Sequence, residues 1–279
     1  MRTIVHLSDL HFGRVDHTLV EPLLDVVRSV NPDVTAVSGD LTQHAFEKEF
    51  LAASAFLRQL TGRLIVVPGN HDMAFLNPWK RATQRLRMFR QLISNDPEPF
   101  YVDDEIAVLG LNTARVTHLR DGRIREWQIA RLEERMAEVT HSGTRILVTH
   151  HPFDLPAIFP ASEIVGSGAR YFKRVVSCID LMLAGHMHVS HAGPTAMRYN
   201  IGGESAIFVQ AGTALSTRTR TEENAFQVIR TSPGAIEVQQ YTSSAETFTS
   251  AESRVFRKEQ GAWVAASHSE LQSRVPTMP

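Results

Sequence analysis

Residues 64–72 read Leu-Ile-Val-Val-Pro-Gly-Asn-His-Asp, and the organisation of the chain follows from this stretch. The apolar run 64–67 predicts a buried strand, and Pro68 and Gly69 predict a turn directly after it. The turn carries an amide, an imidazole and a carboxylate in succession at residues 70–72, so three different chemical groups follow the end of one strand. Taken alone, residues 70–72 are compatible with an ordinary polar turn, and the other strand ends decide whether they form a site.

Segments on both sides of this stretch alternate between strand and helix. Short apolar runs predict strands at residues 4–7, 34–37, 106–111, 145–148 and 180–184. Apolar residues at helical spacing predict helices at residues 18–30, 46–60, 79–93, 126–139 and 169–176. This alternation indicates an α/β fold in which helices cover both faces of a sheet. Helix 79–93 is basic, and we expect its arginines to form a solvated face rather than a phosphate site.

The pattern changes after residue 188. Short β-type segments divided by glycine or polar turns are predicted at residues 207–210, 225–230, 235–241, 247–257 and 262–266. We expect them to form a second, antiparallel sheet packed on the first. Residues 1–267 are therefore predicted to be a single domain, and the polar tail 268–279 to be poorly ordered.

Composition restricts the class of protein. The 279 residues include 29 basic and 30 acidic ones, and this balance argues against an extended nucleic-acid surface. The first residues have neither the apolar length nor the small-residue cleavage site expected of a signal peptide, and no apolar run approaches the roughly 20 residues that cross a bilayer. The lone Cys178 lies among apolar residues and is expected to be a small core residue. We expect a cytoplasmic protein with no membrane partner, and a homo-oligomer is compatible with the sequence.

Metal-capable side chains follow five of the predicted strands. They are Asp9 and His11, Asp40, Asn70, His150, and finally His186 and His188. Residues two apart in an extended chain face the same side, so each spaced pair is expected to aim at a common point. Seven oxygen and nitrogen donors exceed what one zinc-like ion takes from a protein, and they suit two divalent ions that share a carboxylate. Mixed imidazole and carboxylate ligands favour Mn, Fe, Zn or Co over Mg or Ca.

These motifs carry a family resemblance. The series Asp9-x-His11, Gly39-Asp40, Gly69-Asn70-His71-Asp72, His150-His151-Pro152 and Gly185-His186-x-His188 resembles the calcineurin-like metallophosphoesterase family, in the family's order and without a gap. The match covers residues 4–188. The resemblance implies a four-layer αββα sandwich, to which the β-rich C-terminal part would belong.

The resemblance also implies a role for each residue. Asp9, His11 and His188 would hold one metal, Asn70, His150 and His186 would hold the other, and Asp40 would bridge the two. The family's pattern of histidine, any residue and proline selects His150 as the ligand, which leaves His151 as a neighbour of the site or a wall of its pocket. His71 would contact the substrate phosphate and protonate the leaving oxygen, and Asp72 would orient His71.

The function implied by the resemblance is hydrolysis of a small phosphate ester. The motifs resemble those of class III cyclic-nucleotide and related phosphodiesterases, which would imply hydrolysis of a phosphodiester through attack by a hydroxide that bridges the metals. The same motifs serve phosphomonoesterases, nucleotide pyrophosphatases and nucleases, and a non-catalytic scaffold on this fold is a further alternative. His44, Arg115 and the loop 153–168 are candidate substrate contacts, although an exposed arginine and a plain long loop are equally compatible with the sequence.

Overall fold

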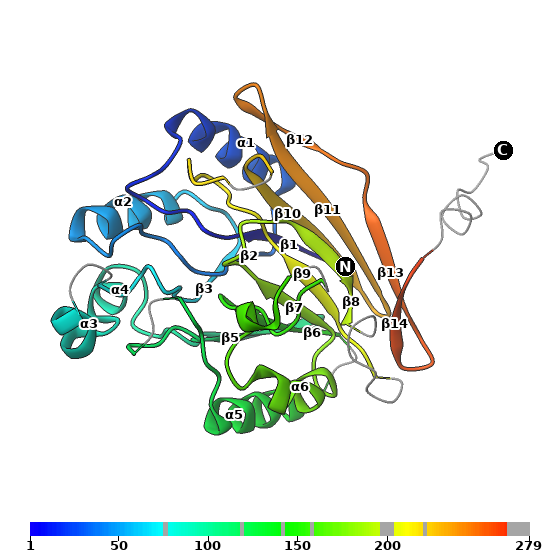
Figure 1. Ribbon diagram of the computed structural model, residues 1–279. Helices are drawn as coiled ribbons and strands as arrows, with labels where there is room; N and C mark the ends of the chain where they lie inside the picture. Colours follow the sequence, from blue (N-terminus) through cyan, green and yellow to red (C-terminus); the bar gives the residue numbers. More distant parts are fainter. Residues whose placement is uncertain are drawn as a thin grey trace.

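The computed structural model describes residues 1–74, 78–117, 120–140, 143–156, 159–195, 204–219 and 222–266. Within them the chain forms two sheets that lie face to face, with helices on the outer side of each (Figure 1). The first sheet contains β1 (Arg2–Leu7), β2 (Val34–Val37), β3 (Arg63–Val66), β10 (Ala225–Ser232), β11 (Ala235–Ser244), β12 (Thr247–Ser250), β13 (Arg254–Glu259) and β14 (Ala262–Ala265). The second contains β4 (Phe100–Val102), β5 (Ile106–Leu111), β6 (Thr144–Thr149), β7 (Leu181–Ala184), β8 (His191–Pro194) and β9 (Ile207–Gln210).

The strand order shows how distant parts of the chain share a sheet. The first sheet runs β14-β13-β11-β10-β1-β2-β3, with β12 paired to β11, and β1 is parallel to β2 but antiparallel to β10. Ile4 therefore lies between Val34 and Ile229. The second sheet runs β4-β5-β6-β7-β9-β8, with β5, β6, β7 and β9 parallel and both edge strands antiparallel.

Helices cover the outer face of each sheet. The short 3-10 turn η1 (His17–Leu19) leads into α1 (Val20–Val30), which covers the first sheet together with α2 (Glu47–Leu57) and α4 (Arg87–Leu92). The helix α3 (Pro78–Gln84) precedes α4, and α5 (Glu126–Ala137) and α6 (Gly168–Val176) cover the second sheet, with the 3-10 turn η2 (Ala161–Glu163) before α6. Periodic apolar residues form these helices because one stripe of each can be buried against a sheet.

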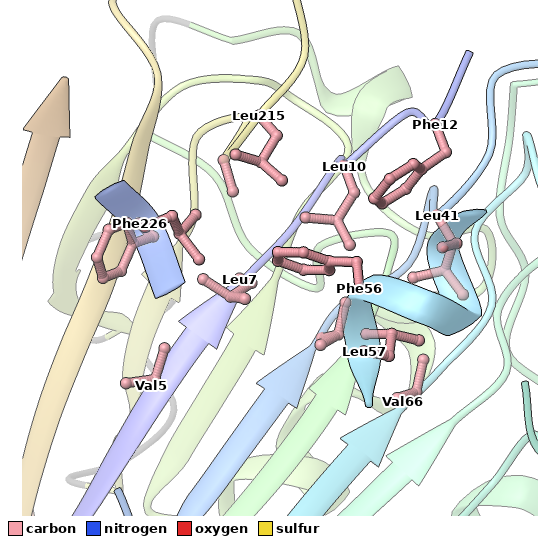
Figure 2. Close-up of a cluster of buried hydrophobic side chains, with 14 of the residues drawn as sticks. Val5, Leu7, Leu10, Phe12, Leu41, Phe56, Leu57, Val66, Leu215 and Phe226 are labelled. Carbon is pink, nitrogen blue, oxygen red and sulfur yellow. The ribbon is translucent and has the colours of Figure 1, made fainter. Parts of the chain in front are cut away.

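Three buried apolar clusters separate the layers. In the cluster between the first sheet and its helices, Leu7 and Val66 of the strands meet Phe56 and Leu57 of α2 (Figure 2). A second cluster lies between the other sheet and α5 and α6. The third cluster lies between the two sheets and contains Ile4 from one and Val148 from the other. The predicted four-layer αββα sandwich with a strand-rich C-terminal part is therefore confirmed.

The predicted division into sheets is wrong. The C-terminal segments do not make a sheet of their own, because β10 to β14 extend the first sheet beyond β1 and β9 joins the second sheet beside β7. The segment predicted as one strand over residues 247–257 is also two strands, β12 and β13. Pairing between β1 and β10 joins residues that are more than 200 positions apart, and local patterns contain no information on such pairing.

The single helix predicted over residues 79–93 is also wrong. It is two helices, because Arg85 between α3 and α4 takes a left-handed backbone conformation with φ of 44°. Arg81 is not on a solvated face either, since its side chain is 2% exposed. Its guanidinium donates hydrogen bonds to the carbonyls of Asn70, Met73, Arg115 and Val116.

Two further expectations concern Cys178 and the tail. Cys178 is half-buried and packs against the cluster under α5 and α6, and burial raises the pKa of its thiol to about 12. It is therefore a packing residue and not an activated nucleophile. The tail 268–279 lies outside the described residues, so the boundary at residue 267 stays a prediction. None of the described helices is long and apolar enough to cross a bilayer.

Candidate metal centre

The seven candidate ligands come together where β1, β2, β3, β6 and β7 end. Five of them have a left-handed backbone: Asp9 (φ 52°), His11 (φ 49°), Asp40 (φ 51°), His186 (φ 77°) and His188 (φ 55°). The sequence pattern suggested that an extended chain aims each spaced pair at a common point. The left-handed backbone at these residues shows that the chain is not extended there. Each strand ends in a kinked turn, and the kink aims the side chain.

Two glycines allow these turns to approach each other closely. Gly39 has φ of 91°, and a Cβ there would lie 2.7 Å from the amide nitrogen of Gly69 and 2.8 Å from Nδ1 of His150. A Cβ on Gly185 would lie 2.6 Å from Oδ2 of Asp9. Any larger residue would push the turns apart, so these glycines precede Asp40 and His186 for reasons of space.

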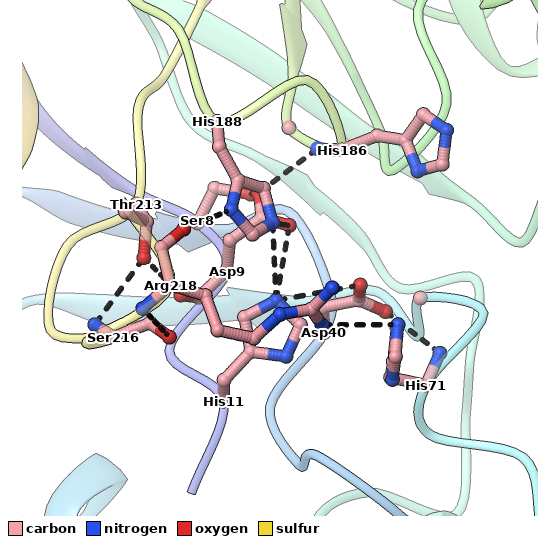
Figure 3. A network of polar contacts seen from close by, with 12 residues as sticks. Ser8, Asp9, His11, Asp40, His71, His186, His188, Thr213, Ser216 and Arg218 are labelled. Carbon is pink, nitrogen blue, oxygen red and sulfur yellow. Dashed lines mark hydrogen bonds and ion pairs between the residues drawn. The ribbon is translucent and has the colours of Figure 1, made fainter. Parts of the chain in front are cut away.

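Asp9, His11 and His188 form the first donor set (Figure 3). Nε2 of His188 lies 3.1 Å from Oδ1 of Asp9 and 3.1 Å from Nε2 of His11. Nδ1 of His188 lies 2.9 Å from the carbonyl of Arg218, which places the proton on Nδ1 and leaves the lone pair of Nε2 directed into the set. Oδ1 of Asp9 is buried and has no hydrogen-bond partner among the described residues. An unpaired carboxylate oxygen beside two facing ring nitrogens fits a cation between them.

Asp40, Asn70 and His150 form the second donor set. Nδ1 of His150 lies 2.8 Å from the carbonyl of Ser38, so the lone pair belongs to Nε2. That Nε2 lies 3.0 Å from Oδ1 of Asn70 and 3.4 Å from Oδ2 of Asp40. The same Oδ2 of Asp40 lies 3.8 Å from Nε2 of His11 in the first set. One carboxylate oxygen therefore stands between the two sets, in the position that the resemblance gives to a bridging ligand.

His186 takes a different position from the other candidates. Its amide donates a hydrogen bond to Oδ2 of Asp9, but Figure 3 shows its ring turned away from Asp40 and His188. The ring centroid lies 5.2 Å from that of His150, and Nε2 lies 3.7 Å from Oε2 of Glu163 in η2. His186 is thus beside the second donor set, with its ring held towards Glu163.

His151 belongs to the same group of rings, and its hydrogen bonds distinguish it from His150. The ligand atoms of His150, His151 and His186 lie close enough together to hold an ion. Both ring nitrogens of His151 are engaged, however, with Nδ1 2.8 Å from Oγ1 of Thr113 and Nε2 2.9 Å from the carbonyl of Arg120. Burial lowers the pKa of His151 well below its usual value, so the ring is neutral and has no spare lone pair. This geometry favours His150 as the ligand, and the assignment itself stays a prediction.

Electrostatics make this place attractive to cations. Burial alone would raise the pKa of Asp9 and Asp40, but the imidazoles around them outweigh it, and both pKa values lie well below the usual range. Burial lowers the pKa of His11 and His186. For His150, burial is outweighed by the Asp40 carboxylate, which raises the pKa to about 9. Two ionised carboxylates in a buried site without a described arginine or lysine partner are typical of a metal centre.

His71 lies at the edge of the centre beside a residue that the sequence analysis missed. Its Nδ1 lies 2.7 Å from the carbonyl of Gln43, and its Nε2 lies 3.5 Å from Nη1 of Arg218. Arg218 also donates to Oε1 of Gln43, and its backbone carbonyl accepts from His188. A cationic side chain thus lies beside His71 at the edge of the centre (Figure 3).

The hydrogen bonds of the Asp72 carboxylate go to groups other than the His71 ring, and its predicted support of His71 stays a prediction. The carboxylate of Asp72 accepts hydrogen bonds from the amides of Leu41, Thr42 and Gly69 and from the Thr42 hydroxyl. Burial, followed by the charge of Asp40, raises the pKa of Asp72 to about 7. Asp72 therefore joins the turn after β2 to the turn after β3. The Thr42 hydroxyl bonds both the Asp72 carboxylate and the backbone carbonyl of His71.

The structure does not bring two further candidates to the centre. His44 is held by Glu49, whose Oε1 lies 3.3 Å from its Nδ1, and it lines a neighbouring cavity of about 740 Å³. Arg115 donates to Oγ1 of Thr117 and lines another cavity, of about 820 Å³. Neither side chain contacts a described member of the two donor sets.

Glu163 and Arg218 are the functional candidates that sequence reasoning missed. Glu163 lies in the loop 153–168, for which a substrate contact was expected without naming a residue. Arg218 follows β9, and β9 ends at the same rim as β7. A polar segment after β9, as after the other parallel strands, was a signal for Arg218. Because the sequence pattern placed residues 207–210 in a separate antiparallel sheet, that segment was not expected at the site.

Comparison with known proteins gives one family and one fold. Residues 2–190 match the model of the calcineurin-like phosphoesterase family. Glycerophosphodiester phosphodiesterase GpdQ of Enterobacter lignolyticus (strain SCF1) is 27% identical over 168 residues, which are 54% of this chain and 58% of that protein. The match thus spans little more than half of that relative's length.

Two solved structures share the fold. Purple acid phosphatase PPD1 from yellow lupin (Lupinus luteus) seeds has a TM-score of 0.65 and 11% identity, and the match covers 97% of this chain and 55% of that one. Vacuolar protein sorting 29 of Cryptosporidium parvum has a TM-score of 0.51 and 14% identity, with 92% and 98% covered. At these identities the likeness shows the architecture alone.

Proposed function

The chain belongs to the calcineurin-like phosphoesterase family, and on that premise we propose that it hydrolyses small phosphate diesters with two divalent transition-metal ions. The observation that carries the proposal is the position of Asp40. Its Oδ2 lies 3.8 Å from Nε2 of His11 and 3.4 Å from Nε2 of His150, so one oxygen can serve a donor in each set. A carboxylate shared in this way suits two ions and is not needed by one.

The donor sets support the choice of cofactor. The first ion would be held by Asp9, His11 and His188, and the second by Asn70, His150 and His186, with Asp40 between them. Such imidazole-rich sets suit Mn, Fe, Zn or Co, and ions of this kind would supply Lewis-acid activation of water and of the phosphate.

The protein's own groups complete the site. Nδ1 of His71 is held by the Gln43 carbonyl, which directs Nε2 towards Arg218. A phosphate bound between them would accept hydrogen bonds from the Arg218 guanidinium, because a guanidinium fork matches phosphate oxygens. A protonated Nε2 of His71 would donate its proton to the leaving oxygen.

Preference for diesters is supported by the sequence relative. The similarity to a protein named as a glycerophosphodiester phosphodiesterase covers 54% of this chain.

A reconstitution screen tests this proposal. The full chain would be loaded separately with Mn, Fe, Zn and Co, and kcat/KM compared for bis(p-nitrophenyl) phosphate, p-nitrophenyl phosphate, cyclic nucleotides and glycerophosphodiesters. We expect diesters to be preferred over the monoester by about tenfold or more. Asp104→Asn is the matched control for Asp40→Asn, because Asp104 is an exposed carboxylate away from the donor sets. A higher kcat/KM on the monoester would show that the protein is a phosphomonoesterase and not a diesterase. Equal activity of Asp40→Asn and Asp104→Asn would contradict the assignment of the active site to the donor sets.

A further inference from the structure

The cavity lined by Arg115 lies next to the metal centre but contains none of its donors. Its volume is about 820 Å³, which is within the range of small-molecule pockets. The wall is formed by the loop after β5, by residues of α3 and α4, and by the first turn of α5. Thr113, between the wall residues Asn112 and Ala114, hydrogen-bonds His151, so one layer of side chains separates the cavity from the histidine cluster.

Positive charge is concentrated in this wall. Five arginines line it: Arg85, Arg90, Arg115, Arg123 and Arg125. None of the five forms an ion pair with a described carboxylate. Arg90 and Arg115 donate to neutral groups, the carbonyl of Asn95 and the hydroxyl of Thr117 respectively. In a chain whose formal net charge is −1, this local excess is not a consequence of composition.

The single carboxylate among the described lining residues is already engaged. Oε1 of Glu98 accepts hydrogen bonds from the amide of Asn112 and from Nε2 of Gln128, and Oε2 pairs with Nη1 of Arg131. Glu98 is 5% exposed and cannot turn to serve the five arginines without breaking these bonds. Guanidinium groups that share a cavity repel each other, and an anionic ligand would relieve that repulsion.

The cavity also has an apolar part. Met73, Leu86, Ala114 and Val116 contribute to the lining, and the indole of Trp127 is 51% exposed at its edge. An exposed aromatic ring beside arginines provides a surface on which a flat ring can stack. Charge and apolar surface together suit a ligand with phosphate at one end and a flat ring at the other.

We propose that this cavity binds a nucleotide, independently of the metal centre. The arginines would hold its phosphates through charge-assisted hydrogen bonds, and Trp127 with the apolar lining would contact the base. Buried Arg81 connects the two sites, because it bonds the carbonyl of Asn70 in the second donor set and the carbonyls of Arg115 and Val116 in the cavity wall. The nucleotide is a separate ligand and not the phosphate that is hydrolysed.

The test is a binding titration of the full chain with ADP, pyrophosphate and adenosine. Binding would be measured by calorimetry and by tryptophan fluorescence. Wild type would be compared with the Arg115→Gln/Arg123→Gln pair, with Asp40→Asn at the metal centre, and with Arg257→Gln on β13 as the control for loss of an arginine elsewhere. We expect the arginine pair to weaken ADP binding by about tenfold or more, since each charge-assisted hydrogen bond contributes that order. Asp40→Asn and Arg257→Gln should leave the Kd for ADP within about twofold, and adenosine and pyrophosphate should each bind more weakly than ADP.

Three results would overturn the proposal. An equal loss of ADP affinity in Asp40→Asn would place the nucleotide at the metal centre. If the double variant Arg115→Gln/Arg123→Gln is folded by circular dichroism and its affinity for ADP is unchanged, the cavity is not the binding site. Arginine-dependent binding of a single-stranded oligonucleotide without binding of ADP would assign the surface to a polymer. A KM for the diester that stays constant as ADP is added supports independence, and a KM that rises in proportion to ADP contradicts it; the titration stands even if the chain hydrolyses no diester.

Discussion

The two donor sets of the metal centre differ in how completely the protein prepares them. In the first set the ring nitrogens of His11 and His188 face each other 3.1 Å apart beside Asp9. In the second set His150 and Asn70 meet at 3.0 Å, but the ring of His186 faces Glu163. The side chains of the first donor set already face one another in the fold, whereas His186 would have to turn away from Glu163 to join the second.

The difference comes from what holds each histidine. The Arg218 carbonyl bonds Nδ1 of His188 and fixes its ring with Nε2 inward. Nε2 of His186, the atom expected to meet a metal, is 3.7 Å from the Glu163 carboxylate instead. Preorganised ligands give tighter binding because less conformational freedom is lost. We therefore expect the first ion to bind more tightly than the second.

The largest effect is expected at the residue that the two sets share. Asp40→Asn should remove both ions and lower turnover by about 10³-fold or more, because an amide cannot supply the shared negative charge. Metal content by mass spectrometry and turnover on a diester would be measured on the same sample. Two ions at full occupancy in this variant would show that Asp40 does not bridge.

The next effect separates metal binding from chemistry. His71→Ala should keep both ions and lose about 10²- to 10⁴-fold in turnover, since the ring nitrogens face Gln43 and Arg218 and the ring meets His11 edge to face, with centroids 5.0 Å apart. Substrates with good leaving groups should suffer less, because they need no proton donor. Equal losses for good and poor leaving groups would argue against proton donation by His71.

A paired substitution tests the contrast between the sets directly. His188→Ala should weaken the tighter ion by about 100-fold, and His186→Ala should weaken the looser ion by only about tenfold, because His186 has to leave Glu163 before it can bind. Stepwise metal titration by calorimetry would resolve the two events. If His188→Ala and His186→Ala weaken metal binding by the same factor, the two donor sets are equally preorganised and the proposed difference between them is wrong.

The smallest effect on chemistry is expected from Arg81. Arg81→Met leaves four carbonyls without the guanidinium and should lower the free energy of unfolding by about 2 to 4 kcal/mol. The loss should appear in thermal unfolding of the metal-free chain, with turnover at low temperature falling less than about tenfold, because Arg81 bonds the backbone of Asn70 and not its ligand oxygen. Arg28→Met, at an exposed arginine of α1, is the control. A collapse of turnover without a change in stability would give Arg81 a direct part in the site.

Local patterns predicted the strands and the position of the candidate ligands after them, because both depend on neighbouring residues, and the ligand roles themselves stay predictions. The run 34–37 is a strand with the predicted bounds, and every predicted donor lies at the end of the strand that precedes it. The break at Arg85 and the burial of Arg81 were not predictable in this way. They depend on carbonyls that other segments bring into place, and a basic helix looks the same in sequence whether its arginines are solvated or buried.

The orientation of side chains at the site was equally out of reach. The sequence places Asp72 next to His71, but the carboxylate meets amides of the preceding turn. Arg218 is close to His71 only because β9 lies beside β7 in the second sheet. Adjacency in sequence predicts neighbours along the backbone, and contacts across turns require the assembled sheets.

The central position of β1 in the first sheet has a consequence for how the protein is made. β1 ends at Leu7, and its antiparallel neighbour β10 begins only at residue 225, so β1 is synthesised long before β10. More than 200 residues of synthesis separate the two, which is roughly 10 to 40 s at typical translation rates. During that interval the edge of β1 that pairs with β10 has no partner within the first sheet, and an unpaired strand edge of this kind is a template for pairing with another chain.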